Sequence, residues 1–138
     1  MARVIVDVGP LVAYVDRTAS GHEWAGAIFR ELRDPLFTCE AVLSEVVFLL
    51  HRGGLHPDCV MEMCERDDLI FDFALGEQIQ AVRSMMRKYP DRPMSLADAC
   101  LVRMSELHED SVVMTLDRDF LIYRRQGRRK IPLLAPFA

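Results

Sequence analysis

The stretch Val4-Ile5-Val6-Asp7-Val8-Gly9-Pro10-Leu11 decides the fold that the sequence predicts. Its short apolar run ends at Gly9 and Pro10, which is typical of a strand buried on both faces of a parallel sheet. Pro10 favours the first turn of a helix, because its missing N–H has no partner there in any case. Asp7 is therefore expected at the carboxyl end of a central strand. Ligands bind at that edge of open α/β sheets, and a buried carboxylate there needs a partner.

Short apolar strands alternate with helical patterns along the rest of the chain. Strands are predicted at residues 36–38, 69–71 and 112–114, with an edge strand at 131–134 because Pro132 cannot donate to a ladder. Helices are predicted at residues 10–17, 22–33, 40–52, 57–66, 75–88 and 95–108, with a loop at 89–93 and a helical turn at 117–123. This alternation favours an α/β fold in which helices cover both faces of a parallel sheet.

Composition indicates one globular domain over residues 1–138, of which 51% are hydrophobic. No segment reaches the roughly 18–20 apolar residues of a membrane span, and the first residues lack the pattern of a signal peptide. The cysteines lack the spacing of a zinc site, and we interpret them as reduced, mostly buried thiols of a cytoplasmic protein. They are Cys39, Cys59, Cys64 and Cys100.

The charge is unevenly distributed along the chain. Residues 1–82 contain 14 acidic and 6 basic side chains, and residues 83–138 contain 7 acidic and 11 basic ones. The net charges of the two parts are therefore −8 and +4. The overall charge of −4 argues against a nucleic-acid partner, whereas the basic second part provides a surface for one. Charged faces that only contact solvent are the alternative interpretation.

Two acidic residues interrupt apolar helix patterns. Glu45 has only apolar residues one helical turn before and after it, so we expect it on or beside a buried face. A salt bridge from Glu45 to an arginine across the core is the structural alternative. Asp98 has similar neighbours, but Ser95-Leu96-Ala97-Asp98 also fits a capping box, in which Ser95 caps the helix.

A further acidic residue, Asp117, follows the strand at 112–114 as Asp7 follows the first strand. Because side chains alternate along a strand, Thr115 and Asp117 are expected to look into the same crevice as Asp7. Capping of the following helical turn is the alternative role for Asp117. Asp119 is rotated by about 200° from Asp117 in a helix and is expected to support the helix dipole or the surroundings of the site.

Four carboxylates are thus expected at one edge of the sheet: Asp7, Glu45, Asp98 and Asp117. Like charges at short range repel and cannot all stay ionised without a cation. Carboxylates without histidine or cysteine select Mg²⁺ or Mn²⁺. Such ions polarise phosphates and lower the pKa of a bound water molecule.

The order and surroundings of these acids resemble the acidic quartet of PIN-domain ribonucleases, which include the VapC-type toxins of toxin–antitoxin pairs. The resembling segments are 5–11 (IVDVGPL), 42–46 (VLSEV), 95–99 (SLADA) and 115–120 (TLDRDF). The resemblance implies a three-layer fold with four or five parallel strands and Mg²⁺- or Mn²⁺-dependent endonucleolytic cleavage of RNA. It implies that all four acids are catalytic, that Asp7, Asp98 and Asp117 bind the metal, and that Thr115 and Asp119 support them.

The resemblance also implies partners for this chain. It suggests a homodimer and a cognate antitoxin, with the helices at 22–33 and 40–52 supplying helix contacts or an antitoxin groove. The arginines that follow Asp117 in the basic second part of the chain are expected to contact RNA phosphates, with Arg118 nearest the metal. The others are Arg124, Arg125, Arg128 and Arg129, followed by Lys130.

One departure from the family pattern leaves an alternative function open. The family usually has Ser or Thr in the two positions after the first Asp, where this chain has Val8 and Gly9. Loss of a supporting hydroxyl can cost about 10–100-fold in metal affinity or activity. The alternative is therefore a PIN-fold interaction or RNA-binding module with weak or no catalysis. A receiver domain with Asp72 as phospho-acceptor is a more distant alternative, which predicts labelling by a small phosphodonor.

Overall fold

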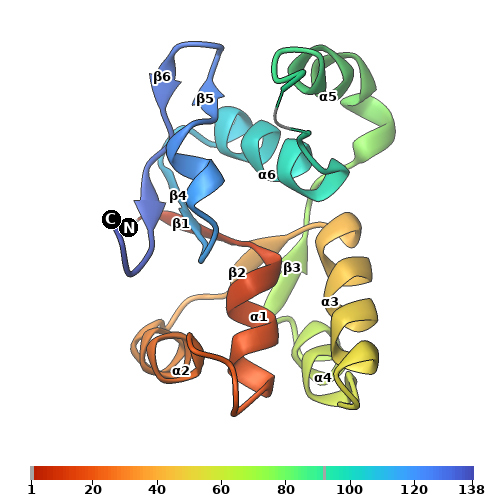
Figure 1. Ribbon diagram of the computed structural model, residues 1–138, viewed down its shortest axis with the longest axis vertical. Helices are drawn as coiled ribbons and strands as arrows, with labels where there is room; N and C mark the ends of the chain where they lie inside the picture. The colour runs from red at the N-terminus through yellow and green to blue at the C-terminus, as the bar shows by residue number, and fades with distance from the viewer. Residues whose placement is uncertain (1, 92) are drawn as a thin grey trace.

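The computed structural model describes residues 2–91 and 93–138, so Arg92 of the predicted loop lies outside the described residues. A sheet of five parallel strands has the order β3-β2-β1-β4-β7, with β1 at its centre (Figure 1). The strands are β1 (Arg3–Val6), β2 (Leu36–Thr38), β3 (Leu69–Phe71), β4 (Ser111–Met114) and β7 (Leu133–Leu134). The predicted parallel α/β fold is confirmed.

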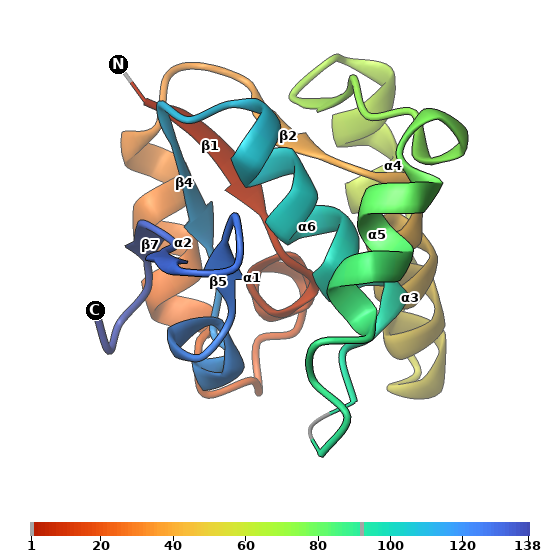
Figure 2. The same ribbon diagram turned by 90° about the horizontal axis from the view of Figure 1, so that it is seen from above.

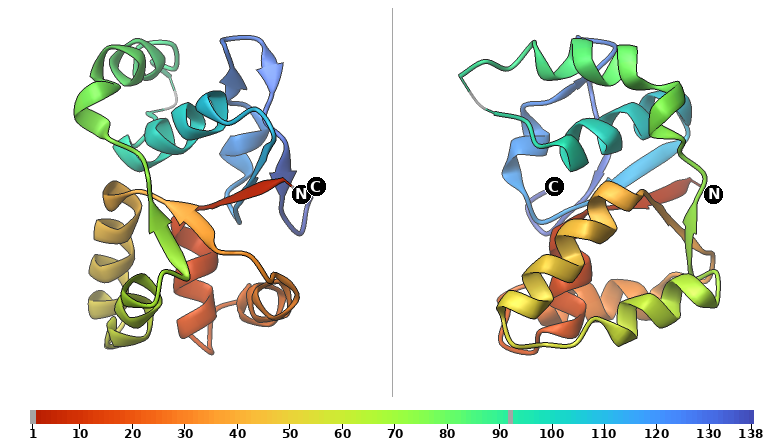
Figure 3. Two further views of the ribbon diagram at one scale, coloured as in Figure 1. Left: turned by 180° about the vertical axis from the view of Figure 1, so that it is seen from behind. Right: turned by 90° about the vertical axis from the view of Figure 1, so that its right-hand side faces the viewer.

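Helices cover both faces of this sheet. They are α1 (Val8–Val15), α2 (His22–Glu31), α3 (Glu40–Arg52), α4 (Asp58–Glu65), α5 (Ile79–Met86) and α6 (Leu96–Leu107). The first four lie on one side of the sheet, and α5 and α6 lie on the other (Figures 1 and 3). None of the helices in the described part of the chain combines the length and apolar character needed to cross a membrane.

The first helix begins two residues before the predicted start. Asp7 has extended backbone and caps α1, so Val8 is the first helical residue and Pro10 the third. Pro10 is still in the first turn, where a backbone N–H has no intrahelical partner. Asp7 therefore ends the central strand and caps the following helix at the same time.

Two further elements differ from the prediction. The single helix expected at 75–88 is split into a 3₁₀ turn, η1 (Leu75–Glu77), and α5, and glycine at position 76 disfavours a continuous helix. The 3₁₀ turn η2 (Arg118–Leu121) leads into an unpredicted hairpin of β5 (Arg124–Arg125) and β6 (Arg129–Lys130). Gln126 and Gly127 both have positive φ at its turn, a conformation that suits hairpins.

The central strands and α6 form the middle of the core. Ile5, Val6, Val113 and Met114 are fully buried, which fits strands covered on both faces. The predicted edge strand is confirmed in β7, since β4 is its neighbour in the sheet and the N–H of Val113 donates to the carbonyl of Pro132 (2.9 Å). All four cysteines are free thiols. Cys39 and Cys100 are buried in the core, but Cys59 is exposed and Cys64 is half-buried, so the prediction that most of them are buried is wrong.

Candidate active site

One pocket at the carboxyl edge of the sheet brings all four predicted acids together. β1 and β4 point to this edge, where α1 begins (Figure 2). Asp7 follows β1, Asp117 follows β4, Asp98 lies in the first turn of α6, and Glu45 projects from α3. The lining residues are Asp7, Val8, Gly9, Glu45, Ser95, Asp98, Leu116, Asp117 and Arg118.

Asp7 is the most buried of these acids, with 5% of its surface exposed. Its Oδ1 accepts a hydrogen bond from the N–H of Val8 (2.7 Å), and its Oδ2 accepts one from the hydroxyl of Thr115 (2.7 Å). Burial raises the pKa of Asp7 to about 7, and repulsion by Asp98 and Asp117 adds to this, although both hydrogen bonds lower it. Asp7 is therefore poised between its two protonation states near neutral pH.

Thr115 connects the acids that follow β1 and β4. Its hydroxyl donates to Asp7 and accepts a hydrogen bond from the N–H of Asp117 (2.9 Å). The side chain of Asp117 is exposed and accepts a hydrogen bond from the N–H of Asp119 (2.9 Å). Asp117 thus caps η2, which is the alternative role predicted for it. Asp119 is not among the residues that line the pocket, and its known link to the site is its backbone N–H to Asp117.

Asp98 is half-buried, and both its backbone N–H and its carboxylate make hydrogen bonds. The hydroxyl of Ser95 accepts a hydrogen bond from the N–H of Asp98 (3.0 Å), so the predicted helix cap is confirmed. The carboxylate, however, accepts a hydrogen bond from the hydroxyl of Tyr123 (3.0 Å). Burial raises the pKa of Asp98 to about 6, and repulsion by Asp117 and Glu45 contributes to the increase. Asp98 therefore belongs to the capped first turn of α6 and also lines the pocket with the other acids.

Glu45 lies in the pocket, and of the two predicted placements it takes the one beside the buried face of α3 rather than on it. The side chain is exposed, as are its apolar neighbours Phe48 (61%) and Leu49 (38%). Within residues 2–91 and 93–138 it has no salt bridge, so the structural alternative is not supported. α3 has apolar residues on several sides, but only a narrow stripe of them is buried, in which successive residues are one helical turn apart. That stripe is Val42, Val46 and Leu50.

The model of the PIN domain family matches residues 4–126 of this sequence. The chain belongs to the PIN-domain family. Its fold is similar to the crystal structure of Mycobacterium tuberculosis VapC20, a sarcin–ricin loop cleaving toxin, with a TM-score of 0.73. The two are 17% identical, and the match covers 84% of this chain and 91% of VapC20. No curated protein sequence matches the chain. The predicted PIN-domain family and its fold are therefore confirmed.

The distant alternative of a receiver domain is not supported for this PIN domain. Asp72, which would be the phospho-acceptor, is paired with Arg3 and lies outside the acidic pocket. Arg3 also stacks on Phe37, with its guanidinium carbon 3.7 Å from the ring centre. Asp72 therefore has a structural partner at a different place in the fold.

The carboxylates of the PIN domain fit a hard divalent cation by their chemistry. Within the described ranges, no group of three or more His, Cys, Asp or Glu side chains is arranged to hold a metal ion. The pocket is nevertheless lined by four carboxylates, and the raised pKa values of Asp7 and Asp98 express their burial and mutual repulsion. A bound cation would relieve this repulsion, and carboxylate oxygens are the ligands that Mg²⁺ and Mn²⁺ prefer.

The predicted RNA-contacting arginines of the PIN domain occupy different environments. Arg118 lines the pocket and lies over the ring of Phe137, with 4.8 Å between the guanidinium carbon and the ring centre. Arg124 is instead bonded to the carbonyls of residues 121–123. Arg129 pairs with Glu109 and Gln126, and Arg128 is exposed at the hairpin turn.

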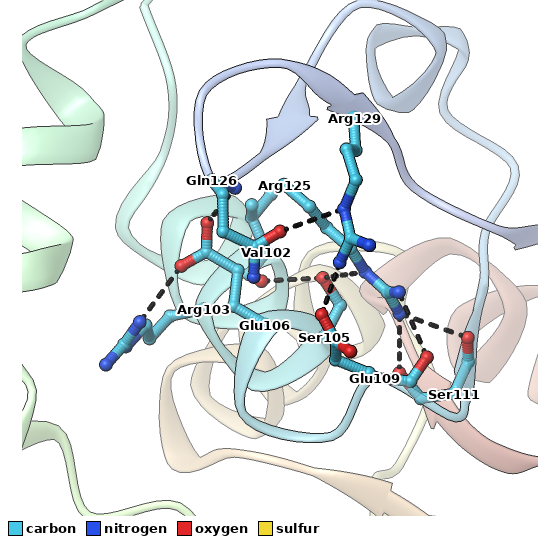
Figure 4. Close-up of polar contacts among 9 residues, drawn as sticks. All are labelled: Val102, Arg103, Ser105, Glu106, Glu109, Ser111, Arg125, Gln126 and Arg129. Carbon is cyan, nitrogen blue, oxygen red and sulfur yellow. Dashed lines mark hydrogen bonds and ion pairs between the residues drawn. The ribbon is translucent and has the colours of Figure 1, made fainter.

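Arg125 belongs to the fold rather than to the surface. It is 5% exposed, and its guanidinium donates to the carbonyl of Glu109 (3.0 Å) and to the carbonyl and hydroxyl of Ser111 (3.2 and 3.0 Å) (Figure 4). A long side chain with this many buried partners is held between β4 and α6. The predicted RNA contact by Arg125 conflicts with this burial.

Replacement of Arg125 by alanine is therefore expected to destabilise the domain by about 2–4 kcal/mol, because buried carbonyls lose their donor. The matched substitution Arg128→Ala should change stability by less than about 0.5 kcal/mol. If Arg128 contacts a phosphate, its loss should lower the salt dependence of RNA binding by about one unit of slope. Urea unfolding and RNA binding at several salt concentrations measure both effects. Equal stability of the two variants would contradict the structural role of Arg125.

Proposed function

We propose that this PIN domain is a Mg²⁺- or Mn²⁺-dependent endoribonuclease and the toxin of a toxin–antitoxin pair. The observation that carries this proposal is the convergence of Asp7, Glu45, Asp98 and Asp117 in one pocket from four separate elements. VapC20, which has a similar fold, cleaves the sarcin–ricin loop, and this supports RNA as the substrate class. Such an enzyme acts in the cytoplasm, where its RNA substrates are.

Asp7, Asp98 and Asp117 are the proposed metal ligands. When bound, the ion supplies a Lewis acid that polarises the phosphodiester and lowers the pKa of a water molecule. Thr115 and the N–H of Val8 hold the two oxygens of Asp7 in a fixed orientation. Glu45 is exposed in the pocket and is the proposed acceptor of the proton released by the attacking water.

Arg118 is the proposed phosphate contact nearest the reacting bond. It is exposed, and among the described residues that line the pocket it is the basic one. Its guanidinium packs on Phe137 and thus keeps its charge beside the pocket. A cation at this place offsets the negative charge that RNA brings to an already acidic site.

A catalytically weak RNA-binding or interaction module is the second candidate, and the environment of Gly9 favours it. A Cβ at position 9 would lie 3.2 Å from the Cβ of Leu116, which is tighter than ordinary contact. A serine hydroxyl is therefore difficult to place there. Thr115 supplies a hydroxyl to Asp7 from the neighbouring strand, so the first candidate remains the one we favour.

The family resemblance also supports a homodimer and a protein antitoxin as partners. The exposed side chains of Phe48 and Leu49 on α3 provide an apolar surface close to Glu45. Sedimentation at high micromolar concentration tests the dimer. A monomer under these conditions would contradict it.

The purified protein is expected to cut single-stranded RNA with Mn²⁺ or Mg²⁺ and to stop when a chelator removes the ion. Asp98→Asn is the matched inactive variant, because an amide is a poor ligand for a hard cation. RNA fragments resolved over time on a denaturing gel measure the reaction. RNA that binds but stays intact with every metal would favour the module without catalysis.

A further inference from the structure

We propose that Tyr123 is a positioning residue, which fixes the carboxylate of Asp98 and connects it to the turn that carries Asp117. This inference rests on the proposed metal-dependent function. Tyr123 has no role in the sequence pattern described above, where it only ends a predicted helical turn. Its position in the tertiary structure provides the argument.

The contact with Asp98 is direct and buried on the tyrosine side. Tyr123 is 0% exposed, and its hydroxyl donates to Oδ2 of Asp98 at 3.0 Å. A hydrogen bond to a carboxylate is stronger than one between neutral groups, particularly away from solvent. Ser95 holds the backbone N–H of the same aspartate at the start of α6. Asp98 is therefore held both through its backbone N–H and through Oδ2 of its carboxylate.

The ring that carries this hydroxyl is itself held by aromatic packing. Tyr123 contacts Phe120 and Tyr89 edge to face, with 5.2 Å between the ring centres in each pair. Tyr89 is fixed in turn, because its hydroxyl accepts the backbone N–H of Arg124 (3.1 Å). Edge-to-face packing restricts rotation of the ring, so the phenol oxygen stays where Asp98 needs it.

Tyr123 also belongs to the same turn as the fourth acid. Its N–H donates to the carbonyl of Asp119 (3.2 Å), and the N–H of Asp119 donates to the carboxylate of Asp117 (2.9 Å). The hydroxyl of Tyr123 then crosses to α6 and Asp98. The carboxylates of Asp117 and Asp98, which repel each other, are thus linked through the backbone of Asp119 and the residue Tyr123. Such supporting contacts around metal ligands orient the ligands and strengthen binding.

Isothermal titration of Mn²⁺ into Tyr123→Phe, with wild type alongside, tests this assignment. Phenylalanine keeps the packed ring and removes only the hydroxyl. We expect Mn²⁺ binding to weaken about 10–100-fold and RNA cleavage at fixed Mn²⁺ to fall in parallel. Tyr14→Phe is the matched control, since it removes a hydroxyl from a tyrosine that packs edge to face on Phe29, outside the acidic pocket. It should leave Mn²⁺ affinity within about twofold of wild type.

A double-mutant cycle with Asp98→Asn separates positioning from a general effect on folding. If Tyr123 acts through Asp98, then Tyr123→Phe should have almost no further effect on Mn²⁺ affinity in the Asp98→Asn background. Additive effects would overturn the proposal, as would unchanged Mn²⁺ affinity in Tyr123→Phe or a Tyr123→Phe protein that does not fold. Absence of Mn²⁺ binding to the wild type would refute the proposed function as well, and is distinguishable from these results.

Discussion

Replacement of Asp7 by asparagine is expected to reduce metal-dependent RNA cleavage by at least about a thousandfold, because a metal ion contributes several kcal/mol to charge stabilisation in the transition state. Asp7 is the buried carboxylate at the centre of the pocket, and an amide is a poor ligand for a hard cation. Cleavage rates at saturating Mn²⁺ measure the loss. Asp16→Asn, at the opposite end of α1 and outside the pocket, is the matched control and should retain full activity.

The same substitution should change how stability depends on pH in chelator. The folded-state pKa of Asp7 is about 7, against an ordinary value of 3.8, so the folded protein holds a proton that the unfolded chain releases. The free energy of unfolding of wild type therefore decreases as pH rises from about 4 to 7. Asp98, with a pKa of about 6, contributes with the same sign. Asp7→Asn should lose most of this decrease and become the more stable protein above pH 7.

Melting temperatures of both proteins between pH 4.5 and 8.5 measure this difference. Mg²⁺ should raise the melting temperature of the wild type near neutral pH, because it binds the folded state with its acids charged. It should have little effect on Asp7→Asn. Parallel curves for the two proteins in chelator would contradict the burial of an ionisable carboxylate at position 7.

Asp117→Asn is expected to lower cleavage at fixed Mn²⁺ by about a hundredfold, and Asp119→Asn by less than about tenfold. Asp117 lines the same pocket as Asp7 and Asp98 and raises the pKa of both by repulsion, so we expect its carboxylate to share their cation. Asp119 does not line the pocket and contributes its backbone N–H to Asp117. An amide at position 119 leaves that backbone donor in place.

Cleavage as a function of Mn²⁺ concentration distinguishes the two roles. A weakened ligand should be partly compensated by more Mn²⁺, so the activity of Asp117→Asn should recover as the concentration increases. Both variants remove one negative charge from the same short turn, so a difference between their activities cannot come from the change in net charge. The reverse order of effects would assign Asp119 as the ligand.

The sequence alone determined the central strand, the place of Asp7 and the cap of α6. Each of these depends on neighbouring residues: an apolar run that leads into an aspartate able to cap the next helix, and a serine three residues before an aspartate. α3 begins and ends at the predicted residues for the same reason, since Gly53 follows its last turn. Local patterns define where strands and helices end, and parallel topology then brings their carboxyl ends to one edge.

Only the tertiary structure decided which side chains contact each other across that edge. Thr115 bonds to Asp7 from 108 residues away, and Tyr123 reaches Asp98 from 25 residues away. α3 is apolar on several faces, so its buried stripe, and with it the exposure of Glu45, depends on how it packs against α1 and α6. Arg125 likewise appears as one of several surface arginines until β4 and α6 surround it. Hydrogen bonds and burial between distant segments leave no periodic signal in the sequence, because they depend on packing geometry rather than on local pattern.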